Sequence, residues 1–209
     1  IQAMYEEAFF NLLEVVHAKY SVNQLTLAGG CAMNSVANGK IYRRSPFKQI
    51  YIQSAAGDAG GAIGAAFVVA NELGETKDRF YMDHAYWGPS FDNSYHKKLL
   101  TDNHKELNLA GCSVDFVEDE DVLCKQTAEA ISNGLVIGWF QGRMEWGPRA
   151  LGNRSILGDP RRNDMKDILN LKIKRRESFR PFAPSILRER VSDWFEEEDD
   201  VPFMMQVFQ

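Results

Sequence analysis

Arginine, glycine and proline gather in two short phrases of this sequence. The first runs from Trp146 to Ser155 and the second from Arg175 to Ser185. Between residues 143 and 190, ten Arg and three Lys stand against six Asp and Glu, a net charge of +7, whereas the whole chain carries −5. A planar guanidinium group binds phosphate or carboxylate through two parallel hydrogen bonds, and glycine lets a backbone amide approach the same ligand. The two phrases therefore predict a binding site for small oxyanions.

A purely structural interpretation of these cations is also open. The acidic run from Glu196 to Asp200 follows the second phrase closely, and it could neutralise a basic surface. Charges that are paired in this way are usually solvated and need no ligand. The sequence by itself leaves both interpretations standing.

Two glycine-containing turns in the first third of the chain are further candidates. Gly29 and Gly30 follow an apolar phrase, and Asn34 lies just beyond them at the start of an expected helix. Free amides at a helix start favour phosphate, although Gly-Gly turns at strand ends are common for structural reasons alone. Asp58 lies in the second turn, residues 55–61. Its carboxylate can either bind a cation or cap the helix that follows.

The other metal-binding residue types are not arranged as a recognisable site. A divalent metal takes at least three protein ligands, so Asp58 is insufficient alone. None of the four histidines forms an i, i+4 pair, and we interpret each as a surface or core residue: His17, His84, His96 and His104. The three cysteines are widely spaced, without a Cys-x-x-Cys motif: Cys31, Cys112 and Cys124. An odd number at such spacing indicates reduced thiols and argues against a disulfide framework or a structural zinc.

Composition and length set broad limits. The chain has 209 residues, of which 44% are hydrophobic and 25% charged, which suits one large or two small globular domains. It has no apolar run of about eighteen residues and its first residues lack the basic flank of a signal peptide, so we expect a cytoplasmic protein without a membrane segment. Because it begins with Ile1 and stops inside an apolar, strand-like phrase at residues 204–209, we expect a piece of a longer protein.

The elements that must position these residues follow from periodicity. Apolar residues at spacings of three and four between Tyr5 and Val16 predict an amphipathic helix. The next expected elements alternate: a strand at 24–28, a helix at 34–42, a strand at 49–53 and a small-residue helix at 62–70. A strand, a glycine turn and a helix, twice over, predict an α/β layer whose ligand edge is the C-terminal end of the strands.

The second half is less regular at first. Residues 75–121 are interpreted as a connecting segment with a short helix at 94–101. Further expected elements are a helix at 122–133, a strand at 135–140 that leads into the first arginine phrase, a helix capped by Asn163 that runs to Leu171, and a helix at 185–195.

Several phrases together carry a resemblance to a known family. They are Gly29–Asn34, the Ala55–Gly60 turn before its Ala/Gly helix, Trp139–Leu157 with its Gly-Pro-Arg-Ala-Leu-Gly-Asn-Arg core, and Arg180–Ser185. In this order, and over most of the chain, they resemble the O-carbamoyltransferases of antibiotic and nodulation-factor biosynthesis. The resemblance implies an α/β fold: the end of a Kae1-like lobe of the actin/hexokinase type at residues 1–74, a connection at 75–120, and part of a YrdC-like lobe at 121–209.

The resemblance also implies a reaction and its reactants. In such enzymes the YrdC-like lobe makes carbamoyl adenylate and pyrophosphate from carbamoyl phosphate and ATP. The Kae1-like lobe then transfers the carbamoyl group to a hydroxyl of a small-molecule acceptor, near a divalent metal of the iron or magnesium type. Asp58 matches the metal-binding aspartate of the family, and the paired histidines of the family's His-x-x-x-His motif are expected upstream of Ile1.

The resemblance assigns roles to the candidate residues. Because two anionic reactants must meet, fixed cations are the main catalytic requirement. The first choices for this clamp are Arg149, Lys174 and Arg180. The expected ligand-binding residues are Gly29, Gly30, Asn34, Arg143, Gly147, Gly152, Arg154 and Lys172. Glu145 and Glu177 are expected to orient guanidinium groups, and four arginines with acidic neighbours are interpreted as solvated charge: Arg161, Arg162, Arg188 and Arg190.

One alternative function belongs to a different class. YrdC-like lobes also occur in tRNA-modifying enzymes, and a basic patch with interleaved aromatic residues can bind RNA. The net negative chain and the glycine and proline framing favour a closed pocket over an open track, so we do not expect nucleic acid or membrane among the partners.

Overall fold

The computed structural model describes residues 1–75 and 80–208, and it divides into two compact units. Unit 1 consists of residues 1–86, 146–151 and 185–209, and unit 2 of residues 87–145 and 152–184. Each unit contains helices and a two-stranded sheet, which agrees with the α/β class predicted from the sequence. The predicted boundaries at 74 and 120 stay a prediction. No helix in the described part of the chain is long and apolar enough to cross a membrane.

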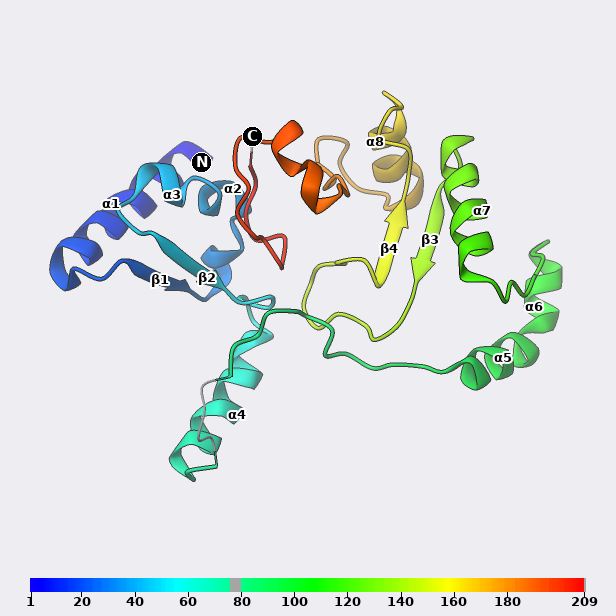
Figure 1. Cartoon of the computed structure of the whole chain (residues 1–209), viewed down its shortest axis with the longest axis horizontal. Coiled ribbons are helices and arrows are strands. Elements are labelled where there is room, and N and C mark those ends of the chain that lie inside the picture. Colours follow the sequence, from blue (N-terminus) through cyan, green and yellow to red (C-terminus); the bar gives the residue numbers. More distant parts are fainter. Residues whose placement is uncertain (76–79, 209) are drawn as a thin grey trace. The chain divides into compact units, whose positions relative to one another are not determined.

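Unit 1 is built on a parallel strand pair (Figure 1). β1 (Gln24–Leu27) lies beside β2 (Gln49–Ile52), with Leu25 opposite Ile50. Parallel strands need a crossover connection, which here contains the 3-10 helix η1 (Gly30–Met33), α2 (Ser35–Asn38) and α3 (Ile41–Arg44). The remaining elements of the unit are α1 (Gln2–Tyr20), α4 (Gly60–Glu72) and the 3-10 helix η3 (Arg188–Asp193).

Two apolar clusters hold unit 1 together. One contains the buried residues of α1, β1 and α3: Phe10, Leu13, Leu25, Ile41 and Phe47. The other joins β2 and the turn after it to residues of the C-terminal segment: Ala32, Ile52, Ala56, Met82, Ala85, Phe203 and Met205. The amphipathic pattern of α1 is thus explained by burial of its Phe10 and Leu13 face.

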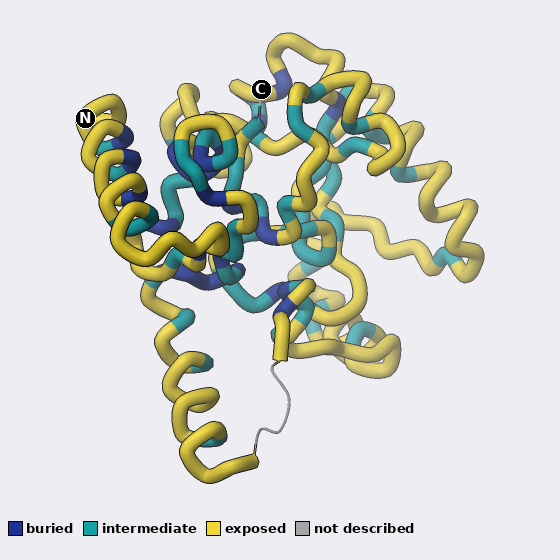
Figure 2. Tube along the Cα trace, turned by 60° about the vertical axis from the view of Figure 1, so that its left-hand side comes forward, coloured by how far each residue is buried: buried dark blue, intermediate teal, exposed yellow. Residues whose placement is uncertain are grey.

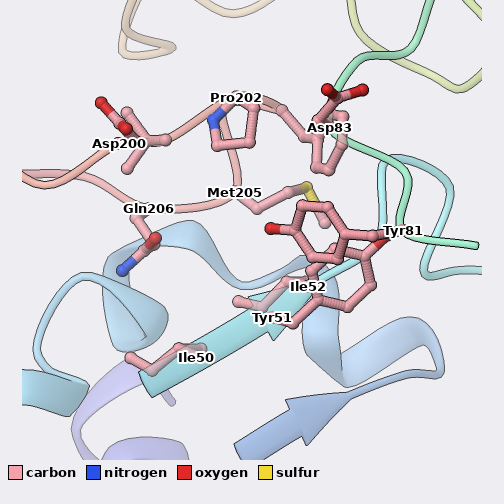
Figure 3. A pocket seen from close by; sticks show the side chains of 11 residues that line it. Ile50, Tyr51, Ile52, Tyr81, Asp83, Asp200, Pro202, Met205 and Gln206 are labelled. Atoms are coloured by element: carbon pink, nitrogen blue, oxygen red, sulfur yellow. The ribbon is translucent and has the colours of Figure 1, made fainter. Parts of the chain in front are cut away.

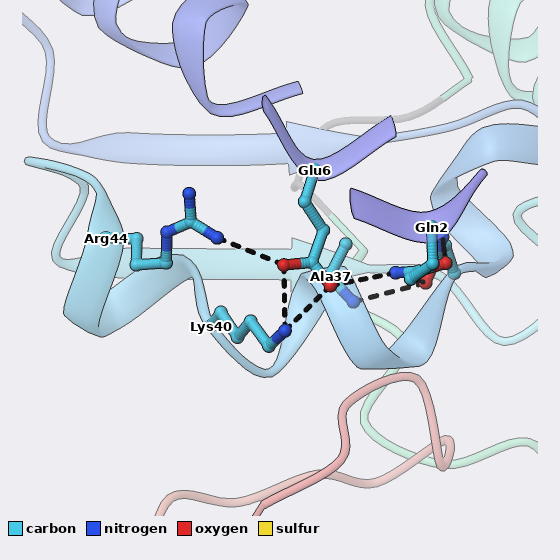
Figure 4. Close-up of polar contacts among 6 residues, drawn as sticks. Gln2, Glu6, Ala37, Lys40 and Arg44 are labelled. Atoms are coloured by element: carbon cyan, nitrogen blue, oxygen red, sulfur yellow. Dashed lines mark hydrogen bonds and ion pairs between the residues drawn. The ribbon is translucent and has the colours of Figure 1, made fainter. Parts of the chain in front are cut away.

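A polar cluster also fixes α1 to the crossover (Figure 4). Glu6 is buried and accepts hydrogen bonds from Lys40 Nζ at 2.7 and 2.8 Å and from Arg44 Nη1 at 3.0 Å. Gln2 donates to Glu6 at 3.0 Å from the preceding turn of α1. These donors, Lys40 first, hold the pKa of Glu6 below its ordinary value. Hydrogen bonds to a charged carboxylate are among the stronger ones in proteins, so this cluster secures the helix to the sheet.

The prediction of one continuous helix at residues 34–42 is wrong. The structure has two short helices, α2 and α3, separated at Gly39 and Lys40. The backbone of Val207 lies so close to Gly39 that an added Cβ would overlap the Val207 carbonyl oxygen. Val207 N donates to Ser35 O at 3.0 Å, and the Asn38 side chain donates to Met205 O at 2.9 Å. The break therefore comes from a tertiary contact with the C-terminal segment.

The C-terminal segment departs from its prediction as well. Residues 204–208 form no strand, and Met204 has a positive φ of 52°; Gln209 lies outside the described residues. The helix expected at 185–195 is reduced to the six residues of η3. The apolar side chains of the C-terminal phrase are used in the core instead, because Phe203 and Met205 are both buried.

Unit 2 contains an antiparallel strand pair and several helices. β3 (Ile137–Phe140) pairs with β4 (Arg154–Leu157), with Phe140 opposite Arg154. The helices are α5 (Asn93–Asp102), α6 (His104–Leu109), α7 (Glu120–Ser132), α8 (Met165–Asp167) and the π-helix η2 (Ile168–Ile173). Aspartates cap two of them, since Asp92 accepts from Tyr95 N and Asp119 from Val122 N.

The predicted elements of unit 2 were partly correct. The helices at 94–101 and 122–133 and the strand at 135–140 are confirmed as α5, α7 and β3. α6 and β4 were not predicted. Asn163 does not cap the next helix, because α8 begins at Met165 and continues as the π-helix η2. Local sequence signals predicted the longer helices and missed the short elements.

Candidate functional site

The first arginine phrase forms the loop of the β3–β4 hairpin. The loop comprises residues 141–153, and its base is closed by Asn153, a residue of unit 2. Its carbonyl accepts from Gln141 N at 3.0 Å, and its side-chain Nδ2 donates to Arg143 O at 2.6 Å. The two paired strands of the hairpin fix both ends of this long loop. The backbone that carries its arginines therefore begins and ends at defined positions.

Glu145 is the buried centre of the loop base. Its Oε1 accepts from Asn153 N at 2.8 Å and its Oε2 from Arg154 Nε at 2.8 Å. The Glu145 side chain is 0% exposed, whereas that of Arg154 is 32% exposed. The carboxylate therefore fixes one edge of the guanidinium and leaves the remainder of the group available. The predicted orienting role of Glu145 is confirmed.

Arg143 is held by backbone carbonyls of its own unit. Its Nε donates to Gly88 O at 2.7 Å and its Nη2 to Trp87 O at 3.3 Å. The guanidinium also lies 5.6 Å from the centre of the Trp87 ring, in a cation–π contact. Through these contacts Arg143 anchors the segment at residues 87–88. The ligand-binding role expected for Arg143 stays a prediction.

Arg149, the central arginine of the phrase, has a different environment. It belongs to unit 1 with residues 146–151. Its Nε is buried and has no hydrogen-bond acceptor among residues 1–75 and 80–208. Burial without a neighbouring carboxylate lowers the pKa of Arg149. A half-buried guanidinium with an unpaired Nε costs free energy, and an anionic ligand would offset part of that cost.

The two predicted glycines of this loop differ in what they need. Gly147 has φ of 122°, and an added Cβ would lie 3.0 Å from Ser54 O within unit 1. Beside it, the Trp146 amide donates to Ala85 O at 2.6 Å. Gly152 has φ of 114°, and among the described residues nothing lies within 4 Å of its added Cβ. Gly147 thus permits close packing, whereas Gly152 permits a turn with an open side.

The second arginine phrase is organised by Asn170, which is fully buried in unit 2. Its Oδ1 accepts from Arg176 Nε at 2.7 Å, while its Nδ2 donates to Arg180 O at 2.9 Å and Ser178 O at 3.3 Å. Arg176 also lies over the Phe182 ring at 4.8 Å. One side chain thereby fixes the loop that carries Arg180. The sequence prediction missed this residue, because an isolated asparagine has no distinguishing local pattern.

The predicted cations of this phrase lie on the surface of unit 2. Arg180 Nε pairs with Glu177 Oε2 at 2.9 Å, so Glu177 contacts a guanidinium group as expected. The pKa of Glu177 is lowered by its own backbone amide and by Arg180. Lys174 follows η2, is exposed and has no side-chain partner in the part of the chain that the structure describes; Lys172 is also exposed. Convergence of these cations with Arg149 stays a prediction.

The four arginines interpreted as solvated charge have acidic partners as predicted. Arg161 pairs with Asp159 at 2.8 Å, and this contact lowers the pKa of Asp159 to about 2. The other pairs are Arg162 with Asp164, Arg188 with Asp200, and Arg190 with Asp193. The acidic run at 196–200 contacts Arg188 and, through Glu196 and Glu197, Arg43. Within unit 1, these carboxylates thus have arginine partners other than Arg149.

The glycine turns of unit 1 lie next to each other, as an α/β ligand edge requires. Gly29 N donates to Ala56 O at 2.6 Å, which joins the turn after β1 to the turn after β2. In the described residues nothing lies within 4 Å of a Cβ added at Gly29 or Gly30, so this side is open. Asn34 caps α2, since its Oδ1 accepts from Ala37 N at 3.1 Å, and it also bonds Gln2.

Asp58 is exposed in the second turn and does not cap α4. The residue before α4 is Ala59, and no side-chain hydrogen bond caps that described helix. The capping alternative for Asp58 is therefore wrong. Among residues 1–75 and 80–208, no group of three or more His, Cys, Asp or Glu is placed to hold a metal. Asp58 can supply one ligand, and the other ligands would have to come from elsewhere.

Unit 1 also contains a pocket that the sequence did not indicate (Figure 3). It measures about 450 Å³ and lies between β2 and the C-terminal segment. Tyr51 and Tyr81 form one wall, with ring centres 5.0 Å apart, and Asp83 and Asp200 lie at its rim. Gln206 Nε2 is buried there without an acceptor in the described residues. The residues come from three distant segments, which is why no sequence motif announces them.

Two family models match the chain. The model described as Carbamoyltransferase N-terminus matches residues 1–67, and the one described as Carbamoyltransferase C-terminus matches residues 128–209. Together they cover most of the sequence and leave residues 68–127 unmatched.

Curated relatives extend the similarity over nearly the whole chain. An uncharacterized protein of Synechocystis sp. is 46% identical over 211 residues, which cover 99% of this chain and 33% of the relative. Nodulation protein NolO of Bradyrhizobium diazoefficiens is 43% identical over 98% of this chain and 36% of its own length. The 3'-hydroxymethylcephem-O-carbamoyltransferase of Amycolatopsis lactamdurans is 30% identical over 87% and 31%. The chain thus spans about a third of the length of these relatives.

Proposed function

Because the chain belongs to the carbamoyltransferase family, we propose that it is part of an ATP-dependent O-carbamoyltransferase. The enzyme would form carbamoyl adenylate from carbamoyl phosphate and ATP and pass the carbamoyl group to a hydroxyl of a natural product or sugar. The name of the cephem relative supports a hydroxyl acceptor. In this proposal residues 1–74 end a Kae1-like lobe and residues 121–209 begin a YrdC-like lobe.

The first step sets the chemical demand on the chain. Carbamoyl adenylate contains the adenylate of ATP and the carbamoyl group, so pyrophosphate leaves ATP and inorganic phosphate leaves carbamoyl phosphate, with one water consumed. Both reactants are anions, and their approach is opposed by charge repulsion unless fixed cations neutralise it. A cation whose donors are all paired with carboxylates is poorly suited to this task, whereas a guanidinium held along one edge keeps donors for a phosphate oxygen.

Arg149 is the observation that carries the proposal. It is the arginine of the described chain whose buried Nε lacks an acceptor, and burial has lowered its pKa. A phosphate oxygen would supply the missing acceptor and the missing negative charge at the same time. Lys174, which is exposed and without a partner in the described residues, would contribute a second cation. Arg154, held from one side by Glu145, would contribute a third.

Arg180 has a less direct role in the proposal. Asn170 fixes its backbone carbonyl, and Glu177 pairs with its Nε. Its Nη groups would remain for a phosphate oxygen, since a carboxylate on the Nε side leaves the other edge of the guanidinium free to donate. The role of Glu177 is then to set the direction of this group.

Among the described residues, Asp58 is the one that we propose as a metal ligand. Asp58 is exposed beside the open turn of Gly29 and Gly30, and a carboxylate there can bind a divalent cation of the iron or magnesium type. The described residues supply no second and third ligand. No catalytic step is therefore assigned to a metal, and the phosphates of ATP are the proposed ligands of the open glycine turn.

Substitution of Arg149 tests the proposal directly. In a full-length enzyme that contains this sequence, Arg149→Ala should lower pyrophosphate release from ATP and carbamoyl phosphate by about 10²-fold or more, the range for loss of one group that stabilises transition-state charge. The melting temperature should not fall, because the variant removes a half-buried guanidinium whose buried Nε has no acceptor among the described residues. Release of pyrophosphate and of inorganic phosphate would be measured together.

Arg190→Ala is the matched control for this experiment. Arg190 is exposed and pairs with Asp193, so its loss should leave pyrophosphate release unchanged. Near-normal release by Arg149→Ala would show that the anion site has been assigned to the wrong residue. A loss of release that is equal in both variants would mean that net charge, rather than the unpaired guanidinium, is responsible.

A further inference from the structure

Helix α4 is apolar on nearly every side. Its sequence over Gly60–Glu72 is GGAIGAAFVVANE, in which Asn71 and Glu72, the last two residues, are the polar ones. A helix on the surface of a globular protein normally has a polar face. A helix that is apolar all round is typical of the interior of a larger protein or of a membrane.

Among the described residues, one side of α4 meets the rest of unit 1. Ile63 packs against the core cluster that contains Ile52 and Ala56, and the Phe67 ring stacks on Phe80 with 5.8 Å between centres. Even so, none of the thirteen residues, all of which the structure describes, is buried. Figure 2 shows the helix exposed along almost its entire length.

The other side forms a continuous apolar surface, which we call the open face. It consists of Gly61, Gly64, Ala65, Val68 and Val69, whose spacings of three, four, seven and eight place them on one side of the helix. Val68 and Val69 are 57% and 54% exposed. In the described part of the chain nothing lies within 4 Å of a Cβ added at Gly61 or Gly64.

We propose that the open face packs against an apolar surface from the part of the carbamoyltransferase polypeptide that the relatives carry outside the region matched here. The relatives are about three times as long as this chain, which supplies that polypeptide. The match to the N-terminal family model covers residues 1–67 and so includes the first turns of α4. This inference depends on membership of the family and not on the proposed reaction.

Two properties of α4 agree with a protein partner. Thirteen residues span about 20 Å, which is shorter than the roughly 30 Å hydrocarbon core of a membrane. The glycines and alanine of the open face have little or no side chain, so the backbone of a neighbouring element can approach closely, and the two valines can fill the spaces between its side chains.

Amide hydrogen exchange tests the proposal in two intact polypeptides, the 209-residue chain and the full-length Synechocystis relative. A thirteen-residue helix that packs along one side, with none of its residues buried, is marginally stable, so α4 amides should exchange rapidly in the chain alone. In the relative, the aligned segment should exchange at least about tenfold more slowly. The segment of α1 is the internal control, since its Phe10 and Leu13 face is already buried in this chain.

Each other outcome overturns the proposal. Rapid exchange of the aligned segment in the relative would show that nothing covers it. Slow exchange in the 209-residue chain at every concentration would show that the chain covers α4 itself. Protection that increases with the concentration of the chain would assign the open face to a second copy.

A substitution pair provides an independent readout in the relative. The substitution aligned with Val68→Thr keeps the shape of the side chain and replaces one methyl group with a hydroxyl, which cannot pair in an apolar contact. It should lower the melting temperature by at least about 2 °C. The substitution aligned with Val15→Thr is matched, because Val15 also lies on a helix of unit 1 and is 59% exposed. Equal melting temperatures of the two variants would contradict the proposal.

Discussion

Arg149 lies in the β3–β4 loop and Arg154 begins β4 five residues later, yet their guanidinium groups have opposite environments. Arg154 has a buried carboxylate, Glu145, at 2.8 Å, whereas the buried Nε of Arg149 has no acceptor among the described residues. Arg154 is thus fixed by an acidic residue, whereas the Nε of Arg149 has no such partner among the described residues. That difference in counter-charge distinguishes Arg149 from Arg154, whose guanidinium is already held along one edge.

Glu6 offers a pH-dependent test at the residue scale. Lys40 and Arg44 lower the pKa of Glu6 from 4.5, so its ionised form stabilises the folded state. At neutral pH, Glu6→Gln should lower the free energy of unfolding by about 1–3 kcal/mol, the range for hydrogen bonds to a charged group. The contribution is complete above pH 4.5 and is lost as the pH falls through the lowered pKa.

Denaturant unfolding between pH 7 and pH 3 would measure this difference. Glu7→Gln is the control, since Glu7 is the exposed neighbour on the same helix. A difference between wild type and Glu6→Gln that stays constant down to pH 3 would show that the ion pairs with Lys40 and Arg44 do not stabilise unit 1.

At the scale of elements, the sequence predicted those whose signal is local. α1 and α7 were predicted because they carry helical periodicity over three or more turns, and β2 because it is a short apolar phrase bounded by turns. β4 was missed because its four residues begin with Arg154 and Ser155, which do not read as a strand. The break between α2 and α3 could not be predicted, since it depends on Val207, far away in the chain.

The candidate site shows the same division. The charge cluster and its glycines are visible in the sequence, as are the acidic neighbours of Arg161 and Arg162. The roles of Asn170 and of the unpaired Nε of Arg149 are not, because burial and hydrogen-bond partners depend on the fold. A capping role for Asp58 was plausible from spacing, and the structure starts α4 one residue too late for it.

Gly39 tests the contact between α2 and the C-terminal segment. A Cβ at this position would overlap the carbonyl of Val207, so Gly39→Ala must displace the segment or the helix. We expect a fall in the free energy of unfolding of about 1–3 kcal/mol, the usual cost of overpacking. Denaturant unfolding measures it. Gly61→Ala is the control, because nothing described lies within 4 Å of its added Cβ; a Gly39→Ala variant as stable as this control would contradict the contact.

At the scale of the whole molecule, the chain should be incomplete as an enzyme. It spans about a third of its relatives and its described residues hold no metal site. We expect the isolated 209 residues to bind ATP or carbamoyl phosphate weakly, if at all, and to show no turnover. Calorimetry with each reactant and an assay of carbamoyl transfer to a hydroxyl acceptor would measure this, and transfer by the isolated chain would refute it.

The salt dependence of the affinity distinguishes RNA binding from the binding of ATP or carbamoyl phosphate. Four arginines of the basic region at residues 143–190, outside the two phrases, are paired with carboxylates, which reduces the charge available to a phosphate backbone. We therefore do not expect the steep fall of affinity with salt that accompanies release of counterions from RNA.

The discontinuity of unit 1 has a consequence for biosynthesis. Its three segments are separated by the whole of unit 2, and Asn38 bonds Met205 across 167 positions of sequence. A ribosome therefore releases the helices and strands of residues 1–86 long before their last packing partner exists. Until then the apolar surface that awaits Phe203 and Met205 is uncovered, so the nascent polypeptide is most vulnerable to aggregation, and most dependent on chaperones, during the synthesis of its middle.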